Sequence, residues 1–173
     1  MIKQTRVLLL LLASMNATAA DRFTIFAKQE FNYTDNISSV GISSIMSSPH
    51  SSLKSEVITS VNSVTVIDQF GYEQAYYGLD LGLRFGYFSD LFIYFEGGFD
   101  VFEATFKHDD DAPYFDYDDR YNANNLDGYA SFGAGVQAGN LRVEGFVKAR
   151  QIDSDYWEAN RSLFYGMQVS LAF

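Results

Sequence analysis

The most regular pattern along the chain is a strict alternation of apolar residues with polar or small ones. In the segment 74–87, QAYYGLDLGLRFGY, every odd-numbered position from Ala75 to Tyr87 is apolar or aromatic, whereas the even-numbered positions include Asp80, Arg84 and three glycines. Alternation with a period of two predicts a β-strand that has one apolar and one polar face. The segment is longer than an average strand of about five or six residues. It matches the roughly 9–11 residues of a tilted transmembrane strand.

The same alternation returns in five other segments, which gives six clearly predicted strands. They span residues 22–33, 74–87, 91–102, 129–138, 141–150 and 163–173. Between Ile37 and Asp68 the sequence is rich in serine and alternates poorly. This region forms either one long loop or two strands, 37–46 and 56–67, with a turn at Pro49. Two strands bring the total to eight, the smallest usual size of an outer-membrane barrel, and we therefore predict eight.

The predicted connections between these strands differ in length. The turns FSDL and GN are short, whereas the segments 108–128 and 152–162 are long and polar. Short turns at one end and long loops at the other are typical of an up-and-down barrel in an outer membrane. The predicted fold class is therefore all-β: an antiparallel, up-and-down transmembrane β-barrel of eight strands that follows a cleavable signal peptide.

The start of the chain has the order of features that marks a secretory signal peptide. Lys3 and Arg6 precede the apolar run 7–13, and the small residues Ala17 and Ala19 provide a cleavage site. We therefore expect residues 1–20 to be removed during export and residues 21–173 to form the barrel domain in the cell outer membrane.

Alternation alone does not decide which face points outward, because a soluble barrel also alternates. Seven glycines lie on the polar face, where a water-exposed surface would usually carry Lys, Glu and Thr. Small residues suit a narrow interior in which side chains from all strands compete for space. Aromatic residues near predicted strand ends are typical of the girdles at the two membrane interfaces. They are Tyr33, Phe70, Tyr72, Tyr87, Phe88, Phe106, Tyr129, Tyr156 and Trp157.

The polar face also carries charges of both signs. Enclosed charges must pair, because an unpaired buried charge is very costly. We therefore predict a charge network inside the lumen, although the charges alone also fit a solvated face. The predicted members are Asp80, Arg84, Glu96, Asp100, Arg142, Glu144, Lys148 and Arg150.

The terminal segment LFYGMQVSLAF ends on an aromatic residue, with apolar residues at every second position before it. In this feature, and in architecture over the whole mature chain, the sequence resembles the small outer-membrane β-barrels of Gram-negative bacteria, of the OmpA and OmpX type. The resemblance implies a monomer whose last strand is an assembly signal read by the barrel-assembly machinery. The sequence departs from OmpA itself in that we expect no peptidoglycan-binding domain after the barrel. The signal residues are Tyr165, Met167, Val169, Leu171 and Phe173.

Composition narrows the classes of function. The formal net charge is −10, and it becomes more negative when Lys3 and Arg6 are removed. The charge therefore argues against nucleic-acid binding, because phosphate binding requires a positive surface. The chain has no cysteine, which excludes disulfides and thiolate metal sites.

Two histidines are weak candidates for catalysis. The spacing His50-Ser51-Ser52 resembles that of lipid A deacylases, and His108 resembles the loop histidine of palmitoyl-transferring barrels. Spacing alone fixes no geometry between base and nucleophile, so we expect no catalytic residues.

A block of carboxylates follows His108. Its members are Asp109, Asp110, Asp111, Asp116, Asp118 and Asp119. The spacing is not that of an EF-hand, so we expect a solvated acidic loop with no metal site and no cofactor. We still expect Ca²⁺ or Mg²⁺ to matter at this surface, because such cations bridge lipopolysaccharide.

These features predict an outer-membrane barrel with a filled, charged lumen and a structural or surface-interaction role through acidic extracellular loops. The expected partners are outer-membrane lipid and lipopolysaccharide, the barrel-assembly machinery and periplasmic chaperones. Two alternatives remain open: a narrow channel for small solutes and a lipid A-modifying enzyme.

Overall fold

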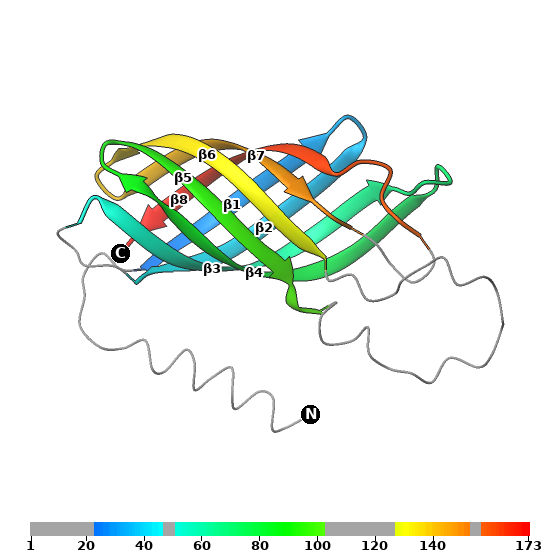
Figure 1. The fold of residues 1–173 in the computed structure, drawn as a ribbon, viewed down its shortest axis with the longest axis horizontal. Helices are drawn as coiled ribbons and strands as arrows, with labels where there is room; N and C mark the ends of the chain where they lie inside the picture. Colours follow the sequence, from blue (N-terminus) through cyan, green and yellow to red (C-terminus); the bar gives the residue numbers. More distant parts are fainter. Residues whose placement is uncertain (1–22, 47–50, 103–126, 153–156) are drawn as a thin grey trace, which may run out of the picture.

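The computed structural model of the chain describes residues 23–46, 51–102, 127–152 and 157–173. Each of its eight strands pairs antiparallel with the next, and β8 pairs with β1, so that the sheet closes into a barrel (Figure 1). The strands are β1 (Phe23–Asn32), β2 (Asp35–Ile45), β3 (Leu53–Ile67), β4 (Glu73–Phe88), β5 (Leu91–Asp100), β6 (Gly128–Ala138), β7 (Leu141–Arg150) and β8 (Leu163–Ala172). The prediction of an all-β, antiparallel barrel of eight strands is confirmed.

No helix in these four described ranges is long and apolar enough to cross a membrane. The predicted signal peptide lies outside the described residues.

The serine-rich region forms two strands, β2 and β3, and not one long loop. The predicted turn at Pro49 lies outside the described residues. Ser39 and Ser43 of β2 and Ser60 of β3 are buried on the inner face of the wall. A barrel interior accepts small polar side chains at positions where a soluble core requires apolar ones, which explains why the apolar alternation is weak here.

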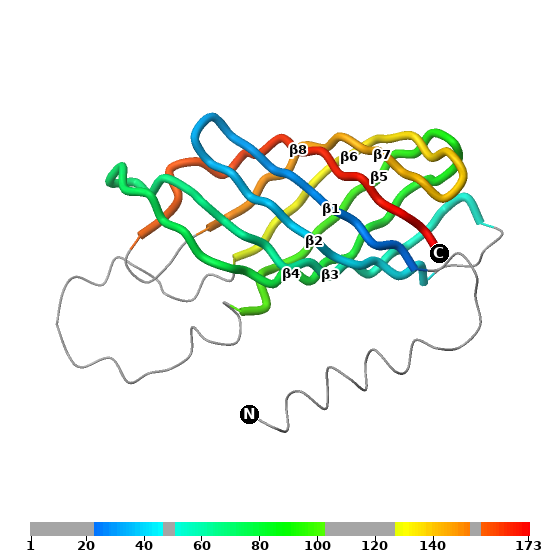
Figure 2. The backbone as a smooth tube through the Cα atoms, turned by 180° about the vertical axis from the view of Figure 1, so that it is seen from behind, coloured from blue at the N-terminus to red at the C-terminus, as the bar shows by residue number. Residues whose placement is uncertain are grey.

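The barrel has two unlike ends (Figures 1 and 2). The turn end holds the β4–β5 turn at residues 89–90, the β6–β7 turn at residues 139–140 and the C-terminus. The opposite end, called the loop end, holds the β1–β2 turn at residues 33–34 and the β3–β4 turn at residues 68–72. These two connections are short as well, so only the other two loop-end connections are long. β3 and β4, with 15 and 16 residues, are the longest strands.

The two faces of the wall differ in polarity. Residues of the polar face are buried inside the barrel, whereas the apolar residues point outward. On β4, for example, Asp80 is 1% exposed and Leu83 is 63% exposed. The polar face is therefore the interior, the reverse of the arrangement in a soluble barrel.

The prediction of outer aromatic girdles is wrong for Phe88 and Tyr129. Phe88 is buried and stacks on Phe92 with ring centroids 5.3 Å apart, and Tyr129 is buried as well. Both residues occupy positions of the polar face. Proximity to a strand end, the basis of the prediction, does not show whether a side chain points inward or outward. Of the other predicted residues, Tyr33, Phe70, Tyr72 and Tyr87 are exposed, Trp157 is partly buried, and Phe106 and Tyr156 lie outside the described residues.

Aromatic rings inside the barrel lie against glycines of neighbouring strands. Tyr94 pairs with Gly133 across β5 and β6, and a Cβ atom on Gly133 would lie 2.4 Å from the Tyr94 ring. Phe146 pairs with Gly166 across β7 and β8, where a Cβ atom would lie 2.1 Å from the ring. The glycines thus make room for large rings in a narrow lumen, and such pairs also protect glycine positions in a sheet.

Two apolar clusters bound the interior along the barrel. The loop-end cluster comprises the buried residues Ile37, Val64, Val66, Ile152 and Phe164, with Tyr76, Trp157 and Ala159 packed against it. The turn-end cluster comprises Phe88, Phe92, Tyr94 and Phe146. Both clusters consist of inward-facing side chains of the strands, apart from Ile152, Trp157 and Ala159, which belong to the β7–β8 connection.

Candidate functional site

Charged side chains fill much of the lumen. On the inner face of β7, Arg142 and Glu144 come first, Phe146 follows, and Lys148 and Arg150 come last. Because β7 runs from the turn end to the loop end, this order separates two groups of charge. All eight residues predicted for the lumen network are buried inside the wall: Asp80, Arg84, Glu96, Asp100, Arg142, Glu144, Lys148 and Arg150.

The group nearer the turn end, called the Arg84 cluster, comprises Arg84, Arg142, Glu56, Glu96, Glu144 and Tyr94. Arg84 Nη2 lies 2.8 Å from Glu96 Oε2 and 2.9 Å from Glu144 Oε1. Arg84 Nη1 lies 3.9 Å from Glu56 Oε2. Arg142 Nη1 donates to Glu56 Oε1 at 2.8 Å. The cluster therefore sets two guanidinium groups against three carboxylates from three other positions of the wall.

Tyr94 fixes the orientation of Arg84. Its hydroxyl donates to Glu144 Oε1 at 2.8 Å, and its ring centroid lies 3.8 Å from Arg84 Cζ. A planar guanidinium can stack on an aromatic face while its N–H groups bind carboxylates in the plane. Since Gly133 adjoins the Tyr94 ring and Gly86 adjoins the Tyr94 Cβ atom, the glycine pattern supports the geometry of the charges.

The group nearer the loop end, called the Lys148 cluster, comprises Lys28, Lys148, Glu30, Arg150 and Asp80. Two ammonium groups share one oxygen: Lys148 Nζ lies 2.6 Å and Lys28 Nζ 3.0 Å from Glu30 Oε1. Arg150 donates to both carboxylate oxygens of Asp80, with Nη1 2.9 Å from Oδ2. Here the cations outnumber the carboxylates, the reverse of the Arg84 cluster. The two clusters therefore carry opposite excess charge on either side of Phe146.

Asp100, the remaining predicted member, is buried at the end of β5. Its Oδ1 accepts the backbone N–H of Phe102 at 2.8 Å and that of Leu79 at 3.3 Å. These bonds fix the point where β5 leaves the wall beside β4.

Sequence reasoning missed three members of the network, Lys28, Glu30 and Glu56. Lys28 and Glu30 lie on the polar face of the first predicted strand, so the alternation could have assigned both to the lumen network. Glu56 lies in the serine-rich region, where the pattern does not reveal which residues face inward. Pairing β3 with β4 places Glu56 directly opposite Arg84.

Several buried polar atoms near the Lys148 cluster have no hydrogen-bond partner within the described ranges. They are Glu30 Oε2, Asn62 Nδ2 and the Tyr129 hydroxyl. Buried polar atoms of this kind usually bind ordered water. In the Arg84 cluster, Glu56 Oε2 also lacks a hydrogen-bond partner among the described residues, so such atoms occur in both halves of the lumen.

The predicted assembly segment is the outer face of β8. Tyr165, Met167, Val169, Leu171 and Phe173 are all exposed on the outside of the wall. The Phe173 N–H donates to the carbonyl oxygen of Phe23 at 2.8 Å, which extends the closing pair of strands to the last residue.

Residues 157–161 of the β7–β8 connection, called the strap, contact the β3–β4 turn across the loop end. Ala159 forms a bridge with Asp68. Gln69 N–H donates to the Glu158 carbonyl oxygen, and Asn160 N–H to the Ile67 carbonyl oxygen, both at 2.9 Å. The strap therefore ties the start of β8 to the end of β3.

Asp68 organises the turn that receives the strap. Its Oδ1 accepts the backbone N–H groups of Phe70 and Tyr72, each at 2.9 Å, and its Oδ2 accepts the Gln74 side-chain amide at 2.8 Å. Desolvation acts to raise the pKa of the Asp68 carboxyl, but the hydrogen bonds from Gln74 and the turn outweigh it. The pKa therefore lies below its ordinary value.

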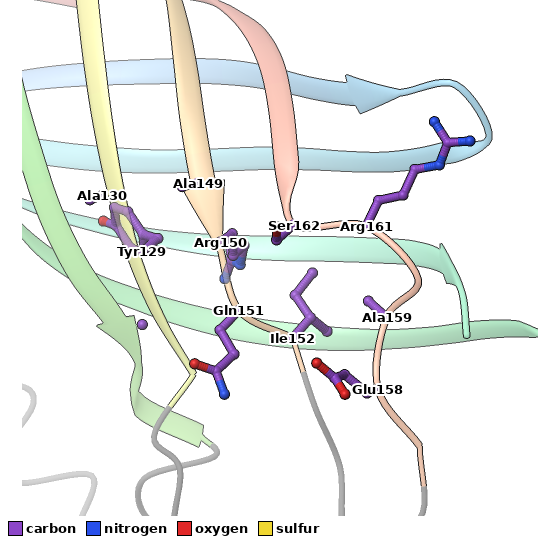
Figure 3. Close-up of a pocket in the computed structure, with 11 residues that line it drawn as sticks. Tyr129, Ala130, Ala149, Arg150, Gln151, Ile152, Glu158, Ala159, Arg161 and Ser162 are labelled. Carbon is purple, nitrogen blue, oxygen red and sulfur yellow. The ribbon is translucent and has the colours of Figure 1, made fainter. Parts of the chain in front are cut away.

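A cavity of about 520 Å³ lies beside the strap, at the loop ends of β6 and β7 (Figure 3). The side chains of Gln151 and Glu158 lie on either side of Ile152, and the Arg161 side chain points away from them (Figure 3). Arg161 instead lies over the Tyr33 ring, with Cζ 4.2 Å from the centroid. The lining contains no histidine, and Glu158 is its one carboxylate.

The candidates for catalysis and cation binding lie elsewhere. His50, His108 and the acidic loop with Asp109, Asp110, Asp111, Asp116, Asp118 and Asp119 are outside the described residues. Within the described residues, no group of three or more His, Cys, Asp or Glu side chains is arranged to hold a metal ion.

The chain was compared with family models, with curated proteins and with solved structures, and no match was found in any of the three.

Proposed function

We propose that the chain is an integral outer-membrane β-barrel protein with a closed, charged lumen and a structural or surface-interaction role. One observation carries this proposal: apolar side chains cover the outside of a closed sheet whose interior is charged and ion-paired. A closed barrel leaves no unpaired strand edge, which is what a lipid environment requires. The inverted polarity would be unfavourable in water, because it exposes large apolar side chains over the whole wall.

In this proposal the barrel resides in the cell outer membrane after export, and acyl chains contact its outer wall. The barrel-assembly machinery and periplasmic chaperones deliver it, and loop-end surfaces meet lipopolysaccharide and divalent cations. The protein acts as a monomer and is not an enzyme. Eight strands enclose a lumen that side chains can fill, so we expect no open pore.

Two measurements test the proposal. On an unboiled gel, the purified protein folded in detergent or vesicles should migrate differently from the boiled protein, since folded outer-membrane barrels resist detergent. Equal migration would favour a soluble protein. In a planar bilayer the folded protein should give no discrete conductance steps, and regular steps would instead identify a narrow channel for small solutes.

The assembly signal can be tested at the last residue. Deleting Phe173 removes an outward aromatic side chain and the N–H that donates to Phe23, so insertion into the outer membrane should decrease severalfold. The matched control is deletion of Asp110, a residue of the acidic loop. The measurement is the amount of each variant in the outer-membrane fraction, and equal amounts would contradict the assigned signal.

A lipid A-modifying activity is tested by the acyl composition of lipid A in cells that produce the chain. We expect no change in its mass. A change that is abolished by His50→Ala or His108→Ala would overturn the structural role.

A further inference from the structure

We propose that the strap, residues 157–161, is a lid that opens onto a polar vestibule which is closed at the turn end. This inference rests on the proposed function, because it specifies which part of the chain closes the lumen toward the loop side. The vestibule is the part of the lumen beneath the loop-end cluster, and the species that it admits are water and small polar solutes.

The strap is attached outside the hydrogen-bond ladder of the wall. The pairing of all eight strands, β8 with β1 included, involves none of the residues 157–161. The strap is held by main-chain bonds from Gln69 and Asn160 and by the bond from Ala159 N–H to the Ile152 carbonyl oxygen at 2.9 Å. The Glu158 N–H also donates to Gln69 Oε1, and Arg161 lies over the Tyr33 ring. It can therefore leave the loop end without breaking a pair of strands, and such local openings require less free energy than global unfolding.

The underside of the strap is an apolar seal. Trp157 and Ala159 pack on the loop-end cluster, and the Trp157 and Tyr76 rings lie 6.1 Å apart. Ile152, which precedes the strap, is 2% exposed. Apolar side chains across the mouth of a polar lumen form a barrier to water and ions, because a narrow apolar constriction is poorly hydrated.

Polar groups lie directly below this seal. On the inner face of β3, Val66 and Val64 are followed toward the turn end by Asn62 and Ser60. Asn62 Nδ2 has no hydrogen-bond partner in the described part of the chain, although Ser60 Oγ donates to Asn62 Oδ1 at 3.2 Å. Glu30 Oε2 is another such atom. Buried polar atoms without partners beneath an apolar lid are the arrangement expected of a vestibule that water enters when the lid opens.

Among the described residues, the turn end has no comparable lid, because the turn-end cluster consists of strand residues alone. Phe88, Phe92 and Tyr94 belong to β4 and β5, and each is held by the pairing of those strands. Phe92 lies against Gly135, where a Cβ atom would lie 2.6 Å from its ring. Opening this end requires rearrangement of the wall itself, so an open strap leads into a vestibule and not through the barrel.

A single cysteine can report access to the vestibule, since the chain contains no cysteine. The reporter is Ser60→Cys, at a buried position below Val64. Intact cells that carry the full chain are treated with a membrane-impermeant thiol reagent, and the rate of labelling is measured. Combining the reporter with Ile152→Ser, which weakens the seal, should raise the rate roughly tenfold.

Two controls accompany this experiment. Leu163→Ser removes a similar side chain on the outside of the wall, and Phe92→Ser weakens the turn-end cluster; neither should raise labelling from outside. An unboiled gel establishes that each variant is folded. If Ile152→Ser does not fold, Trp157→Ala provides a second way to weaken the seal, with the same expected increase.

The outcomes separate this inference from the proposed function. Suppose that Ile152→Ser and Trp157→Ala leave the labelling rate of the reporter unchanged and that the parent protein does not conduct ions. The strap is then not a lid, whereas the proposal of a closed lumen is still supported. If Phe92→Ser raises labelling from outside as much as Ile152→Ser does, the vestibule is not closed independently at its two ends. Conductance in the parent protein contradicts the closed lumen and the lid together. Faster labelling of Ile152→Ser without conductance supports the vestibule.

Discussion

The Arg84 cluster and the Lys148 cluster both enclose charge in the same lumen, but they distribute it differently. Arg84 alone faces three carboxylates and an aromatic ring, so many groups depend on one cation. In the Lys148 cluster two lysines share one oxygen of Glu30, so one carboxylate has two cations. The comparison shows that the number of buried charges does not predict their importance. The cost of removing one charged group depends on how many other buried groups then have no oppositely charged partner.

Arg84→Met should have the largest effect on stability. The substitution leaves Glu96 and Glu144 without their guanidinium, and removing one partner of a buried ion pair typically costs about 3–5 kcal/mol. The free energy of unfolding can be measured by urea titration of the protein in lipid vesicles. Arg161→Met is the control, because Arg161 is exposed at the loop end. A loss no larger than that of the control would show that the carboxylates do not depend on Arg84.

Gly133→Val should act on the same cluster without removing a charge. A Cβ atom at this position collides with the Tyr94 ring, and overpacking of this kind typically costs about 1–3 kcal/mol. The outward-facing neighbour provides a matched control, since Ala134→Val on β6 points away from the lumen and should change stability by less than about 0.5 kcal/mol. Equal effects of the two variants, in the same urea titration, would mean that the glycine is not required to accommodate the ring.

Lys28→Met should cost much less than Arg84→Met, about 1 kcal/mol, the typical contribution of one hydrogen bond. Glu30 keeps its contact with Lys148 at 2.6 Å, and the excess of cations in the Lys148 cluster is reduced. The double variant Lys28→Met/Lys148→Met leaves Glu30 without either ammonium and should lose more than the sum of the single variants. Strict additivity in this cycle would contradict a shared oxygen, and a Lys28→Met loss as large as that of Arg84→Met would remove the difference between the clusters.

Much of this architecture could be predicted, because the residues of β4 to β8 alternate between the apolar outside of the wall and its polar inside. Leu83 and Arg84 are neighbours in sequence, yet one is apolar and exposed and the other is charged and buried. The individual ion pairs could not be predicted, because they depend on register. Arg142 meets Glu56 only because the sheet closes and brings β3 and β7 to opposite sides of one lumen. The strap was unpredictable for a similar reason, since its contact with Asp68 joins segments that no local pattern connects.

The smallest predicted effect concerns Asp68, at the loop end above the Lys148 cluster. Its pKa is lowered in the folded protein, so the charged carboxylate stabilises the fold at pH values above the unfolded pKa of about 3.9. This contribution is lost as pH falls through the lower, folded pKa. Asp68→Asn should therefore be less stable than the parent at pH 7, and the difference should disappear in strongly acidic solution.

Gln74→Ala removes only the bond to Asp68 Oδ2 and should give a smaller difference over the same range of pH. The measurement is urea unfolding of the two variants and the parent at neutral and acidic pH, combined with labelling of the Ser60→Cys reporter. Because Asp68 holds the turn that binds the strap, Asp68→Asn should also increase labelling from outside. A difference in stability that does not depend on pH would assign the effect of Asp68→Asn to lost turn geometry and not to the charge of its carboxylate.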